Sequence, residues 1–168
     1  HIWKKPPSQP WVLDMDGFSN TNNPSILGFT GDGFGNIYCH LRNQSFIPYT
    51  LTRNVGSTTW VGVAQLDNKL ISDQAGRADG VSVFATVSNG LSGGELVRKT
   101  GNSYTNIPLP NGIVTANITS ASVAFDSSGA LWTYFTQYPF TPSPTPPDAI
   151  ETGSGLFYTK DFTSWKKP

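Results

Sequence analysis

The chain has 168 residues, of which 37% are hydrophobic and 13% charged, so it is long and apolar enough to fold as a single domain over residues 1–168 and is not a disordered polymer. Eleven Lys and Arg side chains balance eleven Asp and Glu side chains, which leaves no net positive field to hold nucleic acid or an anionic membrane surface. The apolar runs are far too short to span a bilayer, and we therefore expect no membrane insertion.

Composition indicates an all-β fold. The chain contains 17 Gly, 13 Pro and 12% aromatic residues, a mixture that is typical of strands joined by tight turns rather than of charged helices. Its one cysteine, Cys39, has no partner for an internal disulfide, and we expect it to be buried in a strand. Low charge with many hydroxyl and amide side chains favours an extracellular, secreted or virion-surface location.

In chain order, similar stretches recur in which a tight turn leads into a strand. These stretches are residues 32–38, 79–85 and 126–132. Their leading aspartates are 47 residues apart, and an apolar residue follows each at the same offset. A period of this length is typical of one four-stranded propeller blade. The sequence therefore predicts propeller-type antiparallel blades in about three repeats, at approximately 4–60, 61–104 and 105–165.

The two ends of the sequence share the tetrapeptide Trp-Lys-Lys-Pro, at 3–6 and 165–168. The sequence therefore begins and ends at one phase of the repeat. Three blades are too few for a closed propeller, so we expect a homo-oligomer or a piece of a longer chain, with a β-sandwich as the alternative architecture. The proline-rich stretch 136–149 interrupts the last repeat, and we expect it to be a surface loop because proline cannot donate to a β-ladder.

The last repeat resembles a known family. Residues 118–132 and 155–165 resemble one blade of the Asp-box and sensor-type β-propellers, and they are also similar to the last blade of the five-bladed arabinanase-like glycoside hydrolases. The resemblance implies a structural role for the hairpin around Asp161 and for Trp165. In those families the carboxylate caps backbone amides of the turn, and the aromatic side chain packs between blades.

Catalytic chemistry is less well supported than recognition. A glycoside hydrolase needs two facing carboxyl groups, but most acids here lie in turns, where Asp bonds the local backbone. An alternative polysaccharide-acting enzyme would be a copper monooxygenase with His1 and His40 as ligands, and a partial glycoside hydrolase is a further alternative. The stretch 14–20 could offer oxygen ligands to calcium, but a plain turn fits it better. We expect no metal and no cofactor.

Carbohydrate recognition needs only aromatic faces for sugar C–H groups, with polar side chains for the hydroxyls. The candidate ligand-binding residues are Trp60, Trp132, Tyr134 and Tyr138. Strand alternation sends Trp132 and Tyr134 to one face, and Tyr138 lies at the start of the proline-rich loop. The sequence therefore favours a non-catalytic module that recognises a glycan or cell-surface receptor, with a structural virion or assembly domain as another alternative.

Overall fold

The computed structural model describes residues 2–4, 12–15, 24–138 and 154–168, and these residues form strands, turns and two short 3-10 helices. The first sheet contains β3 (Ser25–Gly31), β4 (Ile37–Arg42), β5 (Pro48–Arg53) and β6 (Val61–Gly62). The second contains β7 (Leu70–Gly76), β8 (Val81–Val87), β9 (Leu96–Thr100) and β10 (Ser103–Ile107). The third contains β11 (Ile118–Phe125), β12 (Leu131–Gln137) and β13 (Gly155–Thr159).

Smaller elements complete the described chain. Strands β1 (Ile2–Lys4) and β2 (Val12–Met15) form an antiparallel pair, and the 3-10 helices are η1 (Ala64–Leu66) and η2 (Thr115–Asn117). Neither described helix has the length and hydropathy needed to cross a membrane. The predicted all-β class is confirmed.

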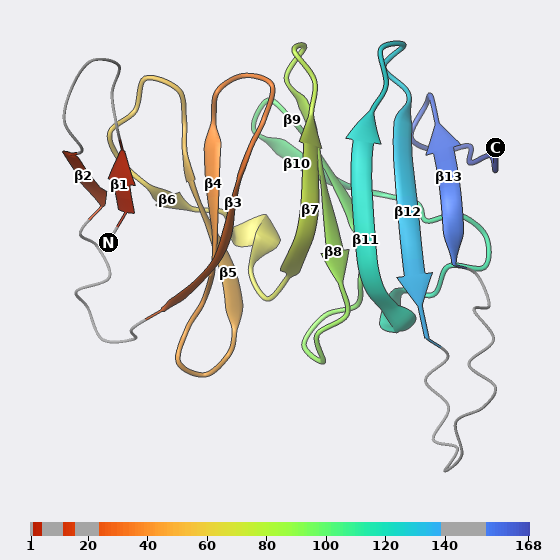
Figure 1. Cartoon of the computed structure of the whole chain (residues 1–168), viewed down its shortest axis with the longest axis horizontal. Coiled ribbons are helices and arrows are strands. Elements are labelled where there is room, and N and C mark those ends of the chain that lie inside the picture. Colours follow the sequence, from red (N-terminus) through yellow and green to blue (C-terminus); the bar gives the residue numbers. More distant parts are fainter. Residues whose placement is uncertain (1, 5–11, 16–23, 139–153) are drawn as a thin grey trace.

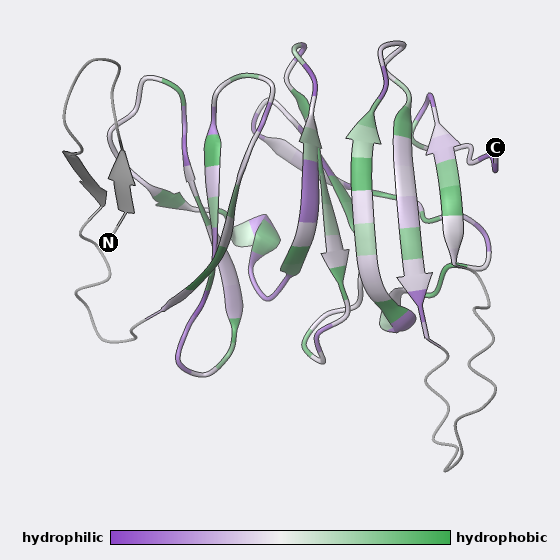
Figure 2. Cartoon of the chain, in the orientation of Figure 1, coloured by the Kyte–Doolittle hydropathy of each residue, from purple (hydrophilic) through white to green (hydrophobic). Residues whose placement is uncertain are grey.

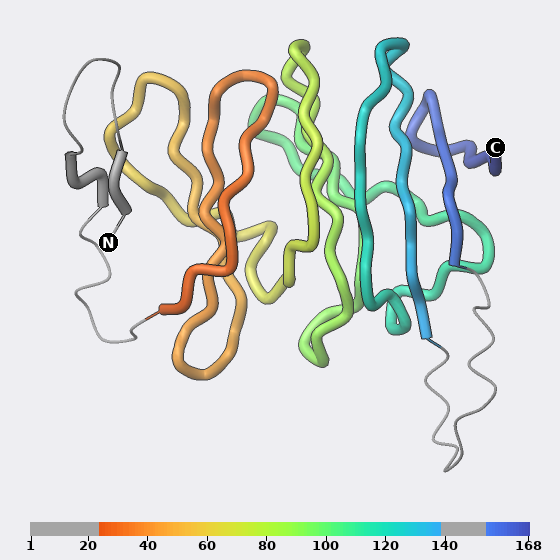
Figure 3. Tube along the Cα trace, viewed as in Figure 1, coloured from red at the N-terminus to blue at the C-terminus, as the bar shows by residue number. Residues whose placement is uncertain are grey.

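Each of the three larger sheets is an antiparallel meander, because strands that follow one another in the chain are hydrogen-bonded neighbours. Figure 1 shows these sheets side by side in chain order, and the continuous trace in Figure 3 shows each one going up and down in turn. The sheets span residues 25–62, 70–107 and 118–159. Tyr158 and Lys166 form an additional antiparallel bridge at the outer edge of the third sheet. The repeat boundaries at 4–60, 61–104 and 105–165 stay a prediction.

Apolar side chains fill the spaces between neighbouring sheets. Tyr38 on β4 and Phe84 on β8 are fully buried and meet edge to face, with ring centroids 5.0 Å apart. A larger cluster joins the second and third sheets, and Leu131, Phe135 and Phe157 belong to it. The alternation along β12, in which odd-numbered residues are buried and even-numbered ones are not, follows from this packing on one face.

The first strand of each sheet lies at a sheet edge, and polar side chains of β7 satisfy the edge of β11. Ser72 Oγ donates to the Ala121 carbonyl at 2.5 Å, and the Val123 amide donates to Asp73 Oδ2 at 2.9 Å. Figure 2 shows this part of β7 as a hydrophilic band. Strand edges with free backbone groups favour unwanted pairing, so these contacts both join the sheets and cover an edge.

The turn between the first two strands recurs in all three sheets, but its period differs from the aspartate spacing. Each turn has a glycine with positive φ: Gly35, Gly80 and Gly129. The residue three places before that glycine closes the turn through its backbone, and these residues are Asp32, Arg77 and Asp126. Asp79 is therefore two residues out of step with the other two aspartates. The equal 47-residue spacing was wrong as a structural period because glycine, not aspartate, provides the φ value that the turn requires.

Candidate functional site

Aromatic side chains gather on the outer face of the third sheet. Trp132 and Tyr134 project from β12 on this face, and Tyr138 comes directly after the end of β12. The register places Leu156 beside Tyr134 and Tyr158 beside Trp132. We call this set, Trp132, Tyr134, Tyr138, Leu156 and Tyr158, the aromatic face. It is accessible, since Tyr134 is 45% exposed and Tyr138 is 54% exposed.

Trp132 is held in place on both its ring and its indole nitrogen. Its ring stacks on Tyr158, with centroids 4.8 Å apart and an interplanar angle of 22°. Its Nε1 donates to Asp126 Oδ2 at 2.8 Å. This hydrogen bond, followed by one from Ser128, lowers the pKa of the Asp126 carboxyl to about 2. The acceptor is therefore charged at neutral pH, and the indole is fixed before any ligand arrives.

Apart from the carboxylate of Asp126, the strand positions that surround the aromatic face are uncharged, and most carry hydroxyl groups. On β11 and β12 the outward positions next to the aromatic side chains are Ser120, Ser122, Ala124 and Thr136. A surface of this kind can contact apolar C–H groups with its rings and bond to hydroxyl groups at its margin. The charge beside it, the Asp126 carboxylate, already accepts the Trp132 indole N–H.

Of the four predicted binding residues, Trp132 and Tyr134 lie on one face of β12, and Tyr138 comes directly after that strand. Trp60 lies apart from these three, because it precedes β6 in the first sheet, and the second sheet lies between the first and third (Figure 1). Trp60 is half-buried against the cluster of Cys39 and Leu41, with the Arg53 guanidinium 5.5 Å from its ring. Its place is that of a packing residue.

His40 is buried, at 4% exposure, and both of its ring nitrogens face hydroxyl groups. Thr30 Oγ1 lies 2.8 Å from Nε2, and Thr50 Oγ1 lies 3.1 Å from Nδ1. A copper ion on this ring would have to displace one of those partners. His1 lies outside the described residues, as does most of the 14–20 stretch considered for calcium. Within the described part of the chain, no group of three or more His, Cys, Asp or Glu side chains could hold a metal ion.

Several carboxylates serve turns or ion pairs. Asp161 accepts hydrogen bonds from the Thr163 and Ser164 amides at 2.8 and 2.7 Å, which holds the pKa of its carboxyl well below the usual range. Trp165 Nε1 donates at 2.6 Å to the carbonyl of Pro108, which comes directly after β10 of the second sheet. Asp161 therefore caps its own turn, and the resemblance to Asp-box blades stays a prediction. Glu95 pairs with Lys69.

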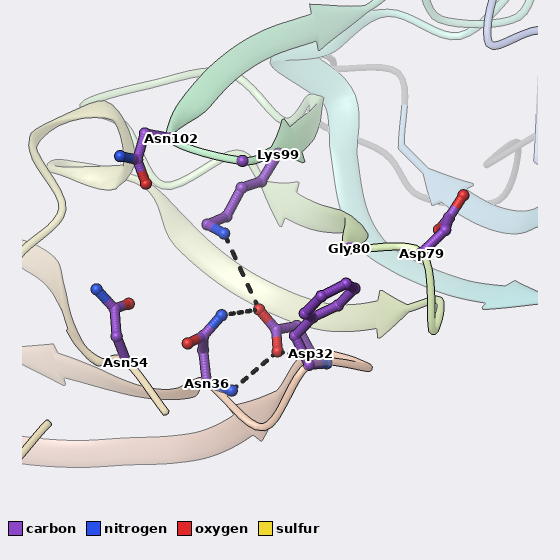
Figure 4. Close-up of a pocket in the computed structure, with 9 residues that line it drawn as sticks. Asp32, Asn36, Asn54, Asp79, Gly80, Lys99 and Asn102 are labelled. Atoms are coloured by element: carbon purple, nitrogen blue, oxygen red, sulfur yellow. Dashed lines mark hydrogen bonds and ion pairs between the residues drawn. The ribbon is translucent and has the colours of Figure 1, made fainter. Parts of the chain in front are cut away.

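Sequence reasoning missed a polar hollow of about 290 Å³ between the first and second sheets. Figure 4 shows it with Asp32 and Lys99 facing each other across its floor. Its other described side chains include Phe34, Asn54 and Asn102. All three lie in turns. Sequence analysis could therefore have grouped them only by recognising that these turns recur.

Comparison with protein-family models found no match to this chain, and comparison with curated proteins found none either.

Proposed function

We propose that the chain is a non-catalytic carbohydrate-recognition module, and that a glycan stacks on the aromatic face of the third sheet. The observation that carries this proposal is the exposure of Tyr134 on the same side of β12 as the fixed indole of Trp132, with the exposed Tyr138 directly after the strand. Aromatic rings bind the C–H faces of sugars, and neighbouring hydroxyl side chains bind their hydroxyl groups.

The spacing on β12 favours a linear polysaccharide over a single sugar. Side chains on one face of a strand repeat about every 7 Å, so Trp132 and Tyr134 offer successive contacts along an extended ligand. Ser122 lies across from Tyr134 on β11 and supplies a hydroxyl beside the ring. Because the charge next to the aromatic face is the negative one of Asp126, a neutral polysaccharide fits it better than an acidic one.

We also propose that the three meanders are radial units of a propeller-type array. The recurring turn at Asp32, Arg77 and Asp126 supports this arrangement, as do the edge contacts from β7 to β11. A face-packed sandwich is the alternative. The proposed setting is extracellular or on a virion surface, where glycans and cell-surface receptors are met, and recognition there requires no cofactor.

The test of glycan binding is native affinity electrophoresis in gels that contain soluble neutral polysaccharides such as xylan, β-glucan and galactomannan. We expect at least one polysaccharide to retard the chain, and Tyr134→Ala to abolish most of that retardation. The matched control is Phe46→Ala, since Phe46 is 73% exposed in the β4–β5 turn, away from the aromatic face. Equal retardation of Tyr134→Ala and Phe46→Ala would contradict the proposal. So would the absence of retardation by every polysaccharide together with the absence of binding to cell surfaces.

A second candidate function, a structural assembly domain, is favoured by a different observation. Trp132 follows its turn glycine at the same distance as Tyr38 and Val83 follow theirs, and both of those residues are buried between sheets. The aromatic face therefore occupies the position that another sheet covers in the first two repeats. An assembly domain would give a concentration-dependent mass in sedimentation, with Tyr134→Lys reducing it to the monomer mass. A mass that Tyr134→Lys leaves unchanged would contradict assembly through the aromatic face.

A further inference from the structure

The polar hollow lies where four turns of two sheets meet. The turn at 32–36 and the residue Asn54 belong to the first sheet, while Gly80 and the β9–β10 turn at 101–102 belong to the second. The two sheets approach closely here, because a Cβ on Gly33 would lie 2.4 Å from the backbone of Arg77. The hollow is therefore a fixed feature of the contact between the sheets.

Asp32 forms the floor of the hollow, and its carboxylate is almost fully used by the protein itself. Its side chain is 1% exposed. Oδ1 accepts hydrogen bonds from the Phe34 and Asn36 amides, both at 2.9 Å, and Oδ2 accepts one from Asn36 Nδ2 at 2.6 Å. Asn36 Oδ1 in turn accepts from the Val55 amide at 2.9 Å. These bonds hold the floor and the wall beside it in one geometry without a ligand.

Other polar groups around the hollow have hydrogen-bonding capacity to spare. Lys99 Nζ lies 4.0 Å from Asp32 Oδ2, which is an ion-pair distance and too long for a hydrogen bond. Lys99 is only 11% exposed, so few of its ammonium protons can be met by bulk water. The side-chain amides of Asn54 and Asn102 form no hydrogen bond within the described residues, and each amide supplies both donors and an acceptor.

One apolar surface completes the hollow. Phe34 is 49% exposed at its rim. The ring packs on Gly80, where a Cβ would lie 2.8 Å from Phe34 Cε2 and where φ is +89°. The glycine therefore both permits the turn and leaves room for the ring. An exposed ring beside amide groups and a lysine is the combination that a sugar ring needs.

The charges around the hollow are balanced. The carboxylate of Asp32 faces the ammonium of Lys99, and the carboxylate of Asp79 is paired with Arg77 Nη2 at 2.5 Å. Figure 4 shows Asp79 pointing away from the Asp32–Lys99 pair. An anion would meet Asp32 and a cation would meet Lys99, so neither is favoured, and a neutral molecule with several hydroxyl groups is.

We infer that this hollow is a second binding site, which takes one neutral sugar unit with its apolar face on Phe34 and its hydroxyl groups on Lys99, Asn54 and Asn102. Its size is below that of pockets for drug-sized ligands and suits a single ring. The site does not depend on the aromatic face, because the hollow lies between the first and second sheets, the aromatic face lies on the third, and they share no residues.

The test is a two-dimensional 1H–15N NMR titration of the whole chain with the methyl glycosides of glucose, galactose, mannose and N-acetylglucosamine. We expect at least one glycoside to shift the backbone amides of Gly80, Gly101 and Asn102, with a dissociation constant on the order of 1 mM because the hollow is open to solvent. Asn102→Ala and Phe34→Ala should each weaken binding by roughly tenfold. Both residues are exposed, so both variants should fold.

Two controls separate this site from the aromatic face. Asn111→Ala removes an exposed turn asparagine outside the hollow and should bind as the wild type does. Tyr134→Ala should bind the glycoside unchanged even where it has lost polysaccharide binding. The inference is overturned if no glycoside shifts the amides around the hollow, or if Asn102→Ala and Phe34→Ala bind as tightly as Asn111→Ala.

Discussion

The guanidinium of Arg77, in the turn of the second sheet, donates a hydrogen bond from Nη1 to the backbone carbonyl of Gly129, in the turn of the third sheet, at 2.9 Å. The same guanidinium lies 5.1 Å from the centroid of the Phe125 ring. Arg77 stands at the turn position that an aspartate occupies in the first and third sheets. One side chain therefore connects the turns of two sheets.

Replacing Arg77 with methionine keeps an apolar stem and removes the guanidinium. We expect Arg77→Met to lower the free energy of unfolding by about 1–3 kcal/mol, since a charged donor to a carbonyl and a cation–π contact are both lost. Urea unfolding should show a lower midpoint with an unchanged slope. Lys160→Met is the control, because Lys160 is exposed. Equal midpoints for the two variants would show that the Arg77 contacts contribute nothing measurable.

The Arg77 turn also shows why the repeat could be predicted only in part. A search for recurring aspartates finds Asp32 and Asp126 at equivalent positions but selects Asp79, which lies two residues beyond its counterpart. The backbone shape of the turn is conserved between the sheets while the side chain that begins it changes from an acid to a base. A search for a regular spacing of one residue type therefore misses the equivalent turn position in the second sheet.

Side-chain direction along a strand was predictable from the sequence, whereas the meeting of distant turns was not. Alternation placed Trp132 and Tyr134 on one face, and burial along β12 confirms it. The hollow depends on the approach of Asn54 and Asn102, which lie in different sheets. No local pattern reports that approach, because it follows from how whole sheets pack.

The contact between Asp126 and Trp132 gives a second prediction. Asp126→Ala removes the acceptor of the Trp132 indole N–H and also the acceptor of the Ser128 and Ala130 amides, at 2.8 and 3.0 Å. We expect the Nε1–H resonance of Trp132 to move upfield in NMR spectra and polysaccharide retardation to weaken, because the ring is no longer fixed. Asp67→Ala, at an exposed site in the first-to-second sheet connection, should change neither. An unmoved indole resonance in Asp126→Ala would rule out this hydrogen bond in solution.

Cys39 provides a chemical probe of the first sheet. The thiol is fully buried, and burial raises its pKa to about 12. The thiolate is the form that attacks the disulfide of Ellman's reagent, so we expect no reaction with this reagent in the folded protein at pH 8. Release of one equivalent of thionitrobenzoate should follow addition of denaturant, since the chain has one cysteine. Rapid reaction without denaturant would mean that the sheet face around Leu41 opens in solution.

Burial of His40 makes stability depend on pH between neutral and mildly acidic conditions. Desolvation lowers the pKa of this imidazole from 6.5 to about 4. When the pH falls below 6.5, the unfolded chain takes up a proton that the folded chain does not accept until near pH 4. The stability that His40 contributes is therefore complete above pH 6.5, declines between 6.5 and 4, and is constant below. The loss approaches about 3 kcal/mol, at 1.36 kcal/mol for each pKa unit.

This decline can be assigned to His40 by comparing urea unfolding of the wild type and His40→Gln at a series of pH values. Glutamine does not titrate and can still bond to the hydroxyl of Thr30 or Thr50, so its stability should change little between pH 6.5 and pH 4.5. The lowered pKa values of Asp126 and Asp161 act at lower pH, because the ordinary value of an aspartate is 3.8 and their stabilisation is lost only as the pH falls below it. If the free energy of unfolding of His40→Gln declines with the same slope as that of the wild type, another group titrates in this window. The folded chain would then protonate His40 as readily as the unfolded chain does.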